Sequence, residues 1–464
     1  MPAAMNTKTA AVVLVAALAI AGAGAGVFLL TKSAPEGYSV DTELQIFGNA
    51  NGDWKLDGDD VTFLDSIISG SIDRTTYADA NQDGVVDASD VEQVQAVIDR
   101  TAEYLWLVDG DGNVKKIGLD ISRIGAEYYS NTELMCILQL QDKVAAVDNA
   151  PYQTRDFYFG EERGDSITNL VNMNAPNYEF VAGLDLDILL TFSYAGTEAK
   201  QEMLQDVDVI YLGMYRPDVL EPEKSEYIQG ILKAGYIFDR VERAEAYVEW
   251  LLDIRDEIAS ISGGIEEEDK VKVLMTNYSN SYFSDDSITD WSIYTKIDPQ
   301  VQALLLAGGY PVAKDILTEE QYNGGPDRTL YGTKVGSEPI VTADIDFIFC
   351  HCVKYTYGGT VVTSTPDHGY GTGDGTGMDA AHALAAGRPL TDFVEDGNIY
   401  IMAGDFRNGA TGGILHAAYI AKAIYPDEFA DFDPVAIHNE YVSEWLGVSD
   451  YDVSTDGVFI SPAV

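Results

Sequence analysis

Apolar residues recur every three to four positions through residues 239–262, which is the pattern of one face of an amphipathic helix. Asp239 is the expected N-cap, two glycines follow residue 262, and at about 1.5 Å per residue the helix is more than about 30 Å long. Segments of βα pattern lie on both sides, so we predict a helix that joins two α/β lobes with a ligand cleft between them. The alternative is an ordinary helix inside one domain. The apolar residues are Ala244, Tyr247, Val248, Leu251, Leu252 and Ile258.

Short sequence motifs predict a hairpin, two strands and a helix in the chain before residue 239. Asp-Gly-Asp-Gly at 109–112 predicts a hairpin, because no calcium ligands follow it at the later positions of a calcium loop. Strands are predicted at 122–125 and 143–147. Between them, Ser130 and Glu133 have capping-box spacing, which predicts a helix that runs to Leu140.

The first 31 residues include an uncharged apolar run at 10–30, which follows Lys8 and is long enough to cross a bilayer core. A cleaved signal peptide is the alternative, since alternating Ala and Gly at 21–26 offer small residues to a peptidase. We favour an uncleaved anchor, because the apolar run continues beyond that site. The expected localisation is therefore the cell membrane, with a single N-terminal anchor and the bulk of the chain outside the cell.

Residues 49–100 contain an internal repeat with a period of 30 residues. Each copy places side-chain oxygens at positions 1, 3, 5, 9 and 12 of a loop and a backbone carbonyl at position 7, which is the arrangement that wraps one Ca²⁺. Gly84 permits the sharp turn at position 6 of the second copy, whereas Trp54 occupies that position in the first. An acidic loop pair without metal is the alternative. The predicted ligands are Asn49, Asn51, Asp53, Lys55, Asp57 and Asp60 in the first loop and Asp79, Asn81, Asp83, Val85, Asp87 and Asp90 in the second.

One short amphipathic helix follows each loop, with Leu64 in the first and Val94 in the second among its apolar positions. One helix per loop, and Asp rather than Glu at position 12, resemble the type I dockerin module. The resemblance implies a small α-helical, calcium-dependent module and a cohesin-like protein as a further partner. We expect the first loop to bind calcium more weakly, because Trp54 resists the turn that glycine makes there.

The composition excludes some partners. The chain has 76 acidic and 28 basic residues, a net charge of −48 that repels nucleic acid and anionic lipid. Three cysteines make no disulfide framework, and Cys350-His351-Cys352 is expected to pack in a strand, where the histidine faces away from both thiols. Enzyme motifs and metal-type histidine spacing are absent from the sequence, so we predict no enzymatic activity.

The two segments that flank the long helix share a pattern. Glu179 and Glu338 each stand eight residues before an Asp, Asp187 or Asp346, that opens an apolar strand. In so acidic a chain this spacing could arise by chance, but its position before the same kind of strand on both sides favours a structural repeat.

Residues 115–446 resemble the substrate-binding proteins of ABC importers for ferric siderophores, haem and cobalamin. The resemblance rests on this repeat, on Leu-Leu-Leu-Ala-Gly-Gly at 304–309, on residues 398–404, and on the two helical patterns that span 420–447. It implies two Rossmann-like lobes bridged by one rigid helix. It also implies that Glu179 and Glu338 dock on arginine pockets of the two permease subunits, although both could be ordinary solvated acids.

Loops after the strands of an α/β lobe supply ligand contacts. Tyrosines in such loops suit stacking on a flat ligand or direct binding of Fe³⁺, and Arg407 could pair with an anionic chelate. The alternative for each tyrosine is packing or a place at the rim. The candidate residues are Tyr128, Tyr129, Tyr152 and Tyr194 in the first lobe and Asn277, Tyr278, Tyr355, Tyr357 and Arg407 in the second.

These observations predict five segments: an anchor at 1–31, a dockerin-like module at 42–102, an N-lobe at 103–238, the linking helix at 239–262 and a C-lobe at 263–464. The predicted function is that of an ABC-importer solute-binding protein that captures a chelated metal, a ferric siderophore before haem or cobalamin. The alternative is a calcium-dependent cell-surface assembly protein that acts through its dockerin-like module.

Overall fold

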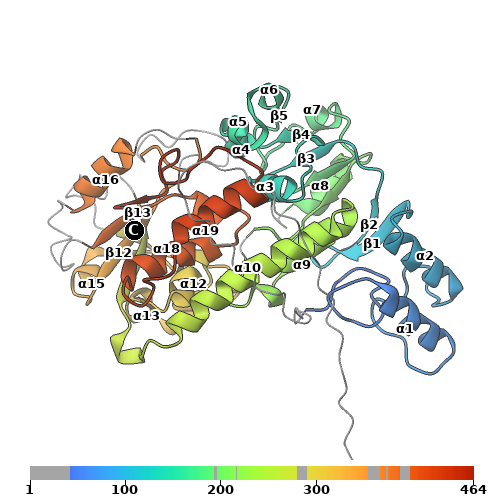
Figure 1. Cartoon of the computed structure of the whole chain (residues 1–464), viewed down its shortest axis with the longest axis horizontal. Coiled ribbons are helices and arrows are strands. Elements are labelled where there is room, and N and C mark those ends of the chain that lie inside the picture. Colours follow the sequence, from blue (N-terminus) through green and yellow to red (C-terminus); the bar gives the residue numbers. More distant parts are fainter. Residues whose placement is uncertain are drawn as a thin grey trace, which may run out of the picture. The chain divides into compact units, whose positions relative to one another are not determined.

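The computed structural model describes residues 42–192, 196–215, 217–278, 290–353, 366–371, 375–386 and 398–464. The predicted long helix is α10 (Val241–Ser262), and its six predicted apolar residues are all buried. It packs on α3 (Tyr129–Ile137) and α9 (Glu226–Ile237) before it in the chain, and on α12 (Pro299–Leu306) and α18 (Ile414–Ile424) after it (Figure 1). The prediction of a helix that joins two α/β segments is confirmed.

The start of α10 differs from the prediction. Asp239 is not the N-cap: its backbone has a positive φ of 55°, and its carboxylate forms an ion pair with Arg100 at 2.9 Å. Arg240 takes the N-cap position without a side-chain hydrogen bond. A charged partner from another segment therefore holds the carboxylate that the sequence assigned to the helix end.

The N-lobe contains a five-stranded parallel sheet with the order β5-β4-β3-β6-β7. The strand that comes first in sequence lies in the centre, so the chain winds outward in both directions and leaves a crevice at the carboxyl ends. The strands are β3 (Ile124–Ala126), β4 (Val144–Val147), β5 (Thr168–Asn169), β6 (Ile188–Leu190) and β7 (Asp208–Ile210), and the remaining helices are α4 (Asn149–Gln153), α5 (Arg155–Phe159), α6 (Glu161–Gly164), α7 (Tyr178–Ala182), α8 (Thr197–Met203) and η1 (Pro222–Lys224).

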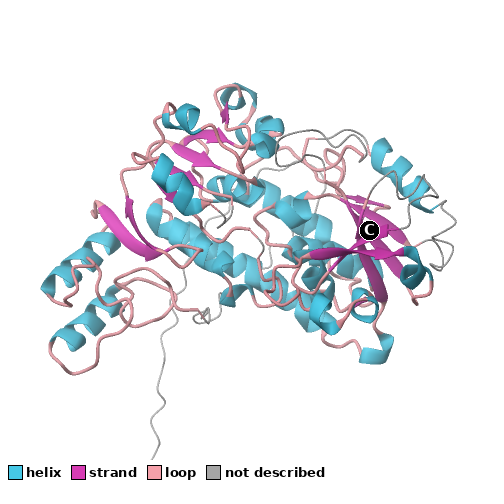
Figure 2. Cartoon of the chain, turned by 180° about the vertical axis from the view of Figure 1, so that it is seen from behind, coloured by secondary structure: helices cyan, strands magenta, loops and turns pink. Residues whose placement is uncertain are grey.

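The C-lobe sheet is mixed and has seven strands, separate from the N-lobe sheet in Figure 2. Three parallel strands, β8, β12 and β13, form its centre. β9 and β14 run antiparallel to them, β11 pairs antiparallel with β9, and β10 pairs parallel with β8. The strands are β8 (Lys272–Asn277), β9 (Asp290–Tyr294), β10 (Tyr310–Pro311), β11 (Gly332–Gly336), β12 (Phe347–His351), β13 (Ile399–Met402) and β14 (Ile460–Ser461). Its remaining helices are η2 (Glu267–Asp269), α13 (Ala313–Ile316), α14 (Glu319–Tyr322), α15 (Ser337–Val341), α16 (Thr376–Ala386), α17 (Asp405–Asn408), α19 (Pro434–Glu440) and the π-helical turn η5 (Tyr441–Trp445).

The repeated acidic pattern has one structural role in both lobes. Asp187 opens β6 and accepts hydrogen bonds from the Ser122 and Arg123 amides at 2.7 and 2.8 Å, which ties β6 to the segment that enters β3. Asp346 precedes β12 and accepts from the Lys272 amide of β8 at 2.7 Å. The same device therefore fixes two neighbouring parallel strands in each lobe, which confirms that the repeat is structural.

The calcium-loop repeat folds as predicted into two loops that lead to α1 (Gly58–Ile68) and α2 (Ala88–Ile98). The hairpin prediction is also confirmed: β1 (Tyr104–Val108) and β2 (Val114–Gly118) pair antiparallel across the turn at 109–112. Ile46, which precedes the loops, bridges to Leu107 of β1. The module is thereby joined to the hairpin by backbone hydrogen bonds as well as by the chain.

The predicted capping box is wrong. The N-cap of α3 is Tyr128 and makes no side-chain cap, while the Ser130 hydroxyl donates to the carbonyl of Met214 at 2.9 Å. Glu133 points instead toward the C-lobe, as described below, and α3 ends at Ile137 rather than at Leu140. Ser130 and Glu133 therefore bond to residues distant in sequence and do not cap the start of the helix.

Candidate functional site

The N-lobe side of the cleft begins where β3 ends. Tyr128 has a φ of 76° and a ψ of 160°, a region that non-glycine residues occupy only at a cost of about 1–3 kcal/mol. Its amide donates to Asp148 after β4 at 2.9 Å, and its hydroxyl donates to Asn408 of the C-lobe at 2.7 Å. The strained backbone thus aims a predicted ligand residue across the gap between the lobes.

Aromatic rings surround Tyr128 at this edge. The ring centroids of Phe192 and Tyr215 lie 4.6 and 5.5 Å from that of Tyr128, and Tyr129 follows at 6.0 Å. Tyr152, another predicted residue, is half-buried and stacks against the guanidinium of Arg155. The N-lobe therefore presents an aromatic wall in which Tyr128 and Phe192 are buried, and the half-buried Tyr129 and Tyr215 offer stacking surface to a flat or apolar ligand.

Buried charged side chains hold the strand ends next to this aromatic wall. Glu127, directly after β3, accepts from Lys200 Nζ at 2.5 Å and from the Thr191 hydroxyl at 3.0 Å, and all three side chains are buried. Burial raises the pKa of Asp148 to about 7, with the neighbouring Glu127 carboxylate as a further cause. These paired groups fix the strand ends from which the cleft residues project.

The C-lobe side contributes two polar pairs. Arg407 of α17 donates to Asp298 at 2.8 Å, and Asp298 is fully buried. The hydroxyl of Tyr294 donates to Asn277 at the end of β8, and Tyr278 beside it is buried. Arg407 therefore already has a carboxylate partner, and a ligand anion has to share its guanidinium with Asp298.

A buried carboxylate joins the two lobes behind this edge. Glu133 of α3 accepts from the amide of Ala410 at 2.6 Å and from the hydroxyls of Tyr441 and Tyr158 at 2.7 and 3.0 Å. The carbonyl of Ala410 in turn accepts from Tyr247 of α10 at 2.6 Å. Burial raises the pKa of Glu133 to about 7, because the charged form has lost its hydration and these hydrogen bonds only partly replace it.

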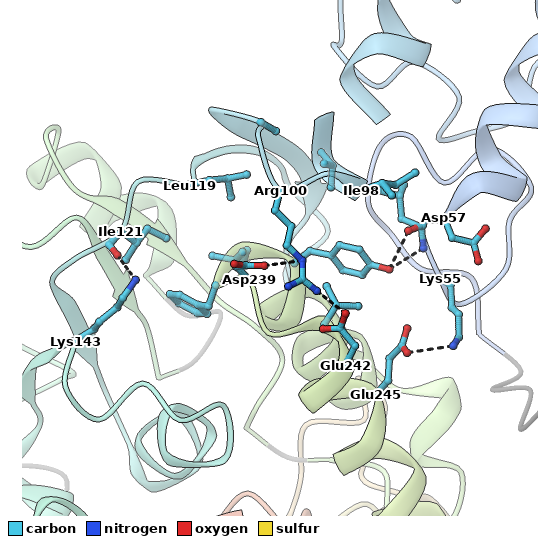
Figure 3. A pocket seen from close by; sticks show the side chains of 17 residues that line it. Lys55, Asp57, Ile98, Arg100, Leu119, Ile121, Lys143, Asp239, Glu242 and Glu245 are labelled. Carbon is cyan, nitrogen blue, oxygen red and sulfur yellow. Dashed lines mark hydrogen bonds and ion pairs between the residues drawn. The ribbon is translucent and has the colours of Figure 1, made fainter. Parts of the chain in front are cut away.

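The lobes nearly close over the cleft. Phe157 and Tyr370 stack across it with ring centroids 4.2 Å apart, and the gap beside them has a volume of about 20 Å³. A larger cavity of about 490 Å³ lies elsewhere, between the calcium-loop module and α10 (Figure 3). The candidate site that the sequence predicts lies at the strand ends, where polar and aromatic groups converge, and is separate from this cavity. The small gap is lined by Tyr129, Thr154, Val353, His368, Tyr370, Gly404, Asp405 and Asn408.

The structure brings some of the predicted cargo residues together. Tyr128, Tyr129 and Arg407 lie at the facing edges, Arg407 being next to Asn408, the partner of Tyr128. Asn277 is the last residue of β8 and Tyr278 follows it, at the carboxyl edge of the C-lobe sheet. Tyr194, Tyr355 and Tyr357 lie outside the described residues. Their part in binding stays a prediction.

The cleft also contains residues that sequence reasoning missed, among them Glu133, Asp298 and Asn408. Glu133 was assigned to a helix cap, and Asp298 is the N-cap of α12 as well as the partner of Arg407. The position of Asp298 just before a proline at a helix start was visible in the sequence, but its partner more than a hundred residues away was not. No sequence signal pointed to Asn408.

Cys350, His351 and Cys352 are all buried, as their predicted packing role requires. Burial raises the pKa of both thiols and lowers that of His351 well below its ordinary value. The histidine is therefore neutral and the cysteines are thiols. Chemistry that needs a thiolate is disfavoured at these positions.

The predicted docking glutamates occupy equivalent places. Glu179 lies in the first turn of α7 and Glu338 in the first turn of α15, and both are exposed. Each helix leads through a short turn to the Asp that ties its strand. The two carboxylates are therefore available to a partner at matching positions of the two lobes.

The two calcium-type loops share one hydrogen-bond frame. Asp60 accepts from the amides of Asn51 and Asp57 at 3.1 and 2.8 Å, and Asp90 accepts from the equivalent amides at 3.2 and 2.8 Å. Both carboxylates are fully buried, and burial raises the pKa of Asp60 to about 6. Across the residues described, no three acidic, histidine or cysteine side chains form a metal-type group, so each loop would combine carboxylates with amide and backbone oxygens. The oxygen donors and the buried carboxylate of Asp60 fit a calcium ion.

Comparison with known proteins yields similarity in structure only. No protein-family model matches the chain, and no curated protein does. The TroA-like periplasmic binding protein FepB from Veillonella parvula is similar over 76% of this chain and 98% of its own, with a TM-score of 0.57 and 15% identity. The fold is that of TroA-like periplasmic binding proteins. CeuE from Helicobacter pylori with Ni(II) bound (TM-score 0.53, 15% identity, 75% and 98% covered) and the molybdate-binding MolA from Haemophilus influenzae (0.52, 16%, 75% and 99%) share this fold.

These comparisons correct the predicted localisation. The similar structures are periplasmic binding proteins, and no helix in the described ranges has both the length and the apolar character to cross a membrane. The expectation of a protein anchored in the cell membrane with its bulk outside the cell is therefore contradicted. Residues 10–30, on which that expectation rested, lie outside the described residues.

Proposed function

We propose that the chain is the solute-binding component of an ABC importer, which captures a chelated metal and delivers it to a permease. The observation that carries this proposal is the repeated Glu-bearing helix, turn and Asp-tied strand in two lobes joined by α10. The fold similarity supports it, since the similar structures are solute-binding proteins.

The cargo we favour is a ferric siderophore, with haem or cobalamin next. The aromatic wall around Tyr128 suits stacking on planar groups of a chelate, and Arg407 supplies positive charge at the facing edge. MolA and CeuE bind molybdate and Ni(II) on the same fold, so small metal species belong in the same screen.

Delivery would use the two exposed glutamates. Glu179 and Glu338 stand on separate lobes, and a pair of charge-assisted contacts with permease arginines would set the receptor with its cleft over the channel entrance. The calcium-type loops would hold Ca²⁺ through the carboxylates of Asp53, Asp60, Asp83 and Asp90 and their neighbours, and stabilise the module.

The experiment is a cargo screen on the full chain. Calorimetry and absorbance with ferric siderophores, haem, cobalamin, Ni²⁺ and molybdate should find one class that binds at micromolar or lower concentration. Tyr128→Ala should weaken that binding by roughly tenfold, because it removes the buried ring on which Tyr129 and Tyr215 pack. Binding of none of these probes, combined with calcium-dependent capture of a cohesin-like protein, would favour the assembly function instead.

A further inference from the structure

The two calcium-type loops differ in what they touch outside the module. The first loop contacts the receptor: Lys55 Nζ lies 3.1 Å from Glu245 of α10, and the amide of Leu56 donates to the Tyr236 hydroxyl of α9 at 2.8 Å (Figure 3). The second loop makes no such contact through its acidic ligand residues. Among the described residues, the hydrogen bonds and ion pairs of Asp79, Asp83 and Asp90 all lie within the module.

The contacts of loop 1 are built into its metal-binding frame. Lys55 occupies position 7, whose backbone carbonyl is a calcium ligand in such loops, and Leu56 is the next residue. The Lys55 amide donates to Asp53 at 2.8 Å, so a shift of that carboxylate moves the residue that pairs with α10. Leu56 is almost fully buried and Tyr236 half-buried, which leaves little slack between the loop and the helices.

Other contacts hold the same region of the receptor. Arg100, just after α2, pairs with Asp239 at 2.9 Å and with Glu242 at 2.5 Å, at the start of α10. Gln229 of α9 donates to Thr42 and to the carbonyl of Glu43, at 2.7 and 2.8 Å. The cavity of about 490 Å³ is lined by Lys55, Leu56, Arg100, Tyr236 and Glu245, so the contacts of the first loop and of Arg100 lie around one gap in this interface.

We propose that the first loop makes the receptor responsive to calcium: an ion held there fixes Lys55 and Leu56 and, through Tyr236 and Glu245, braces the end of α9 and the amino-terminal half of α10. The second loop stabilises the module alone. This inference rests on the proposed calcium binding and assigns different consequences to its two sites. Because α10 joins both lobes, the brace acts on the element that sets their relative position.

The test compares hydrogen exchange of the full chain with and without calcium, while calorimetry counts bound ions. Calcium should slow exchange in residues 236–250 by about five- to tenfold or more, within the range of typical coupling between sites. Asp83→Ala should lose one ion and keep this protection, whereas Asp53→Ala should lose one ion and the protection with it. Tyr236→Phe combined with Glu245→Gln should keep both ions and lose the protection.

The outcomes separate the two proposals. Uptake of calcium without any change in residues 236–250 overturns the brace and leaves calcium binding intact, as does equal loss of protection in the Asp53 and Asp83 variants. An absence of calcium uptake in calorimetry overturns the calcium proposal itself, and the brace with it. The Tyr236→Phe and Glu245→Gln changes lie outside both loops, so a folding defect in the module cannot imitate their expected result.

Discussion

The two lobes hold neighbouring parallel strands together in the same way but with different numbers of hydrogen bonds. In each lobe a carboxylate just before one strand accepts hydrogen bonds from the segment at the start of its neighbour. Asp187 accepts from two backbone amides and the Ser122 hydroxyl, whereas Asp346 accepts from one backbone amide. At the cleft, the N-lobe buries the carboxylates of Glu127, Asp148 and Glu133, whereas the C-lobe buries that of Asp298, which pairs with Arg407, among the residues that the structure describes. The N-lobe therefore buries more carboxylates at the cleft, although each lobe has one exposed glutamate, Glu179 or Glu338, at the matching position of the repeat.

The largest expected effect tests whether the lobes are equivalent in delivery. Glu179→Arg with Glu338→Arg should abolish uptake through the permease, because reversed charge repels the arginines that a glutamate would pair with, and should leave cargo affinity unchanged. Uptake of labelled cargo and calorimetry measure the two properties. Glu162→Arg with Glu319→Arg, equally exposed acids in the first turns of α6 and α14, is the matched control. Normal transport by the double variant would rule out both residues as docking points.

A second prediction concerns the joint between the lobes. The pKa of Glu133 is about 7 in the folded chain against 4.5 as its ordinary value, so between these values the folded state holds a proton that the unfolded state has lost. Its contribution is fully present below about pH 4.5 and is lost as the pH rises through 7, a change of about 3 kcal/mol.

Urea unfolding at pH 5 and pH 8 measures this difference. Glu133→Gln, which keeps the shape without a charge, should make the free energy of unfolding less dependent on pH by that amount. The exposed Glu161→Gln serves as the control and should leave the wild-type pH dependence in place. An unchanged pH dependence in Glu133→Gln would show that the carboxylate is not desolvated at the joint.

The third prediction tests the asymmetry of the strand ties. Asp187→Ala should lower the free energy of unfolding by about 2 kcal/mol and Asp346→Ala by about 1 kcal/mol, since the first removes more charge-assisted hydrogen bonds, each reduced by solvent. Burial alone would raise the pKa of Asp187, yet bonds from Ser122 and Arg123 hold it below its ordinary value. Its contribution is therefore present above about pH 4 and lost as the pH falls through the folded pKa. Equal losses in the two variants, by urea unfolding at pH 7, would contradict the asymmetry.

The smallest expected effect concerns motion. A continuous α10, together with the Glu133 and Tyr247 contacts to Ala410, restricts the lobes to small twists. Small-angle scattering with and without cargo should give radii of gyration that differ by less than about 1 Å. A compaction of several ångströms would show that the joint is a hinge.

The sequence predicted elements whose signals are local. The apolar stripe of α10, the Asp-Gly turn and the spacing of the calcium-type loops each depend on residues close in the chain, and the structure has all three. The Glu–Asp repeat succeeded because it was compared between two segments and not read from one. The two helix-cap predictions were wrong because a distant residue pairs with the side chain in question. Asp239 forms an ion pair with Arg100, and Glu133 accepts a hydrogen bond from the amide of Ala410.

The candidate site was harder to predict than the fold. Tyr128 was nominated because it follows a strand, and it does lie at the cleft, but nothing near it in sequence identified Asn408 as its partner 280 residues away. Arg407 was nominated for its charge, and Asp298, which limits that charge, is 109 residues distant. A site between two lobes depends on pairs of residues that contact each other across the cleft. Residues this far apart in the chain produce no periodic pattern by which one sequence could identify them as partners.

The hydrogen bonds of Glu133 to the C-lobe have a consequence for the order in which the chain folds. Its bonds to Ala410 and Tyr441 close loops of 277 and 308 residues, whereas each sheet pairs strands much closer in sequence. Long loops are entropically costly to close, so each lobe should form first and their docking should come late. The cleft is therefore expected to form last, and a chain stopped before that step would have two ordered lobes without the cleft between them.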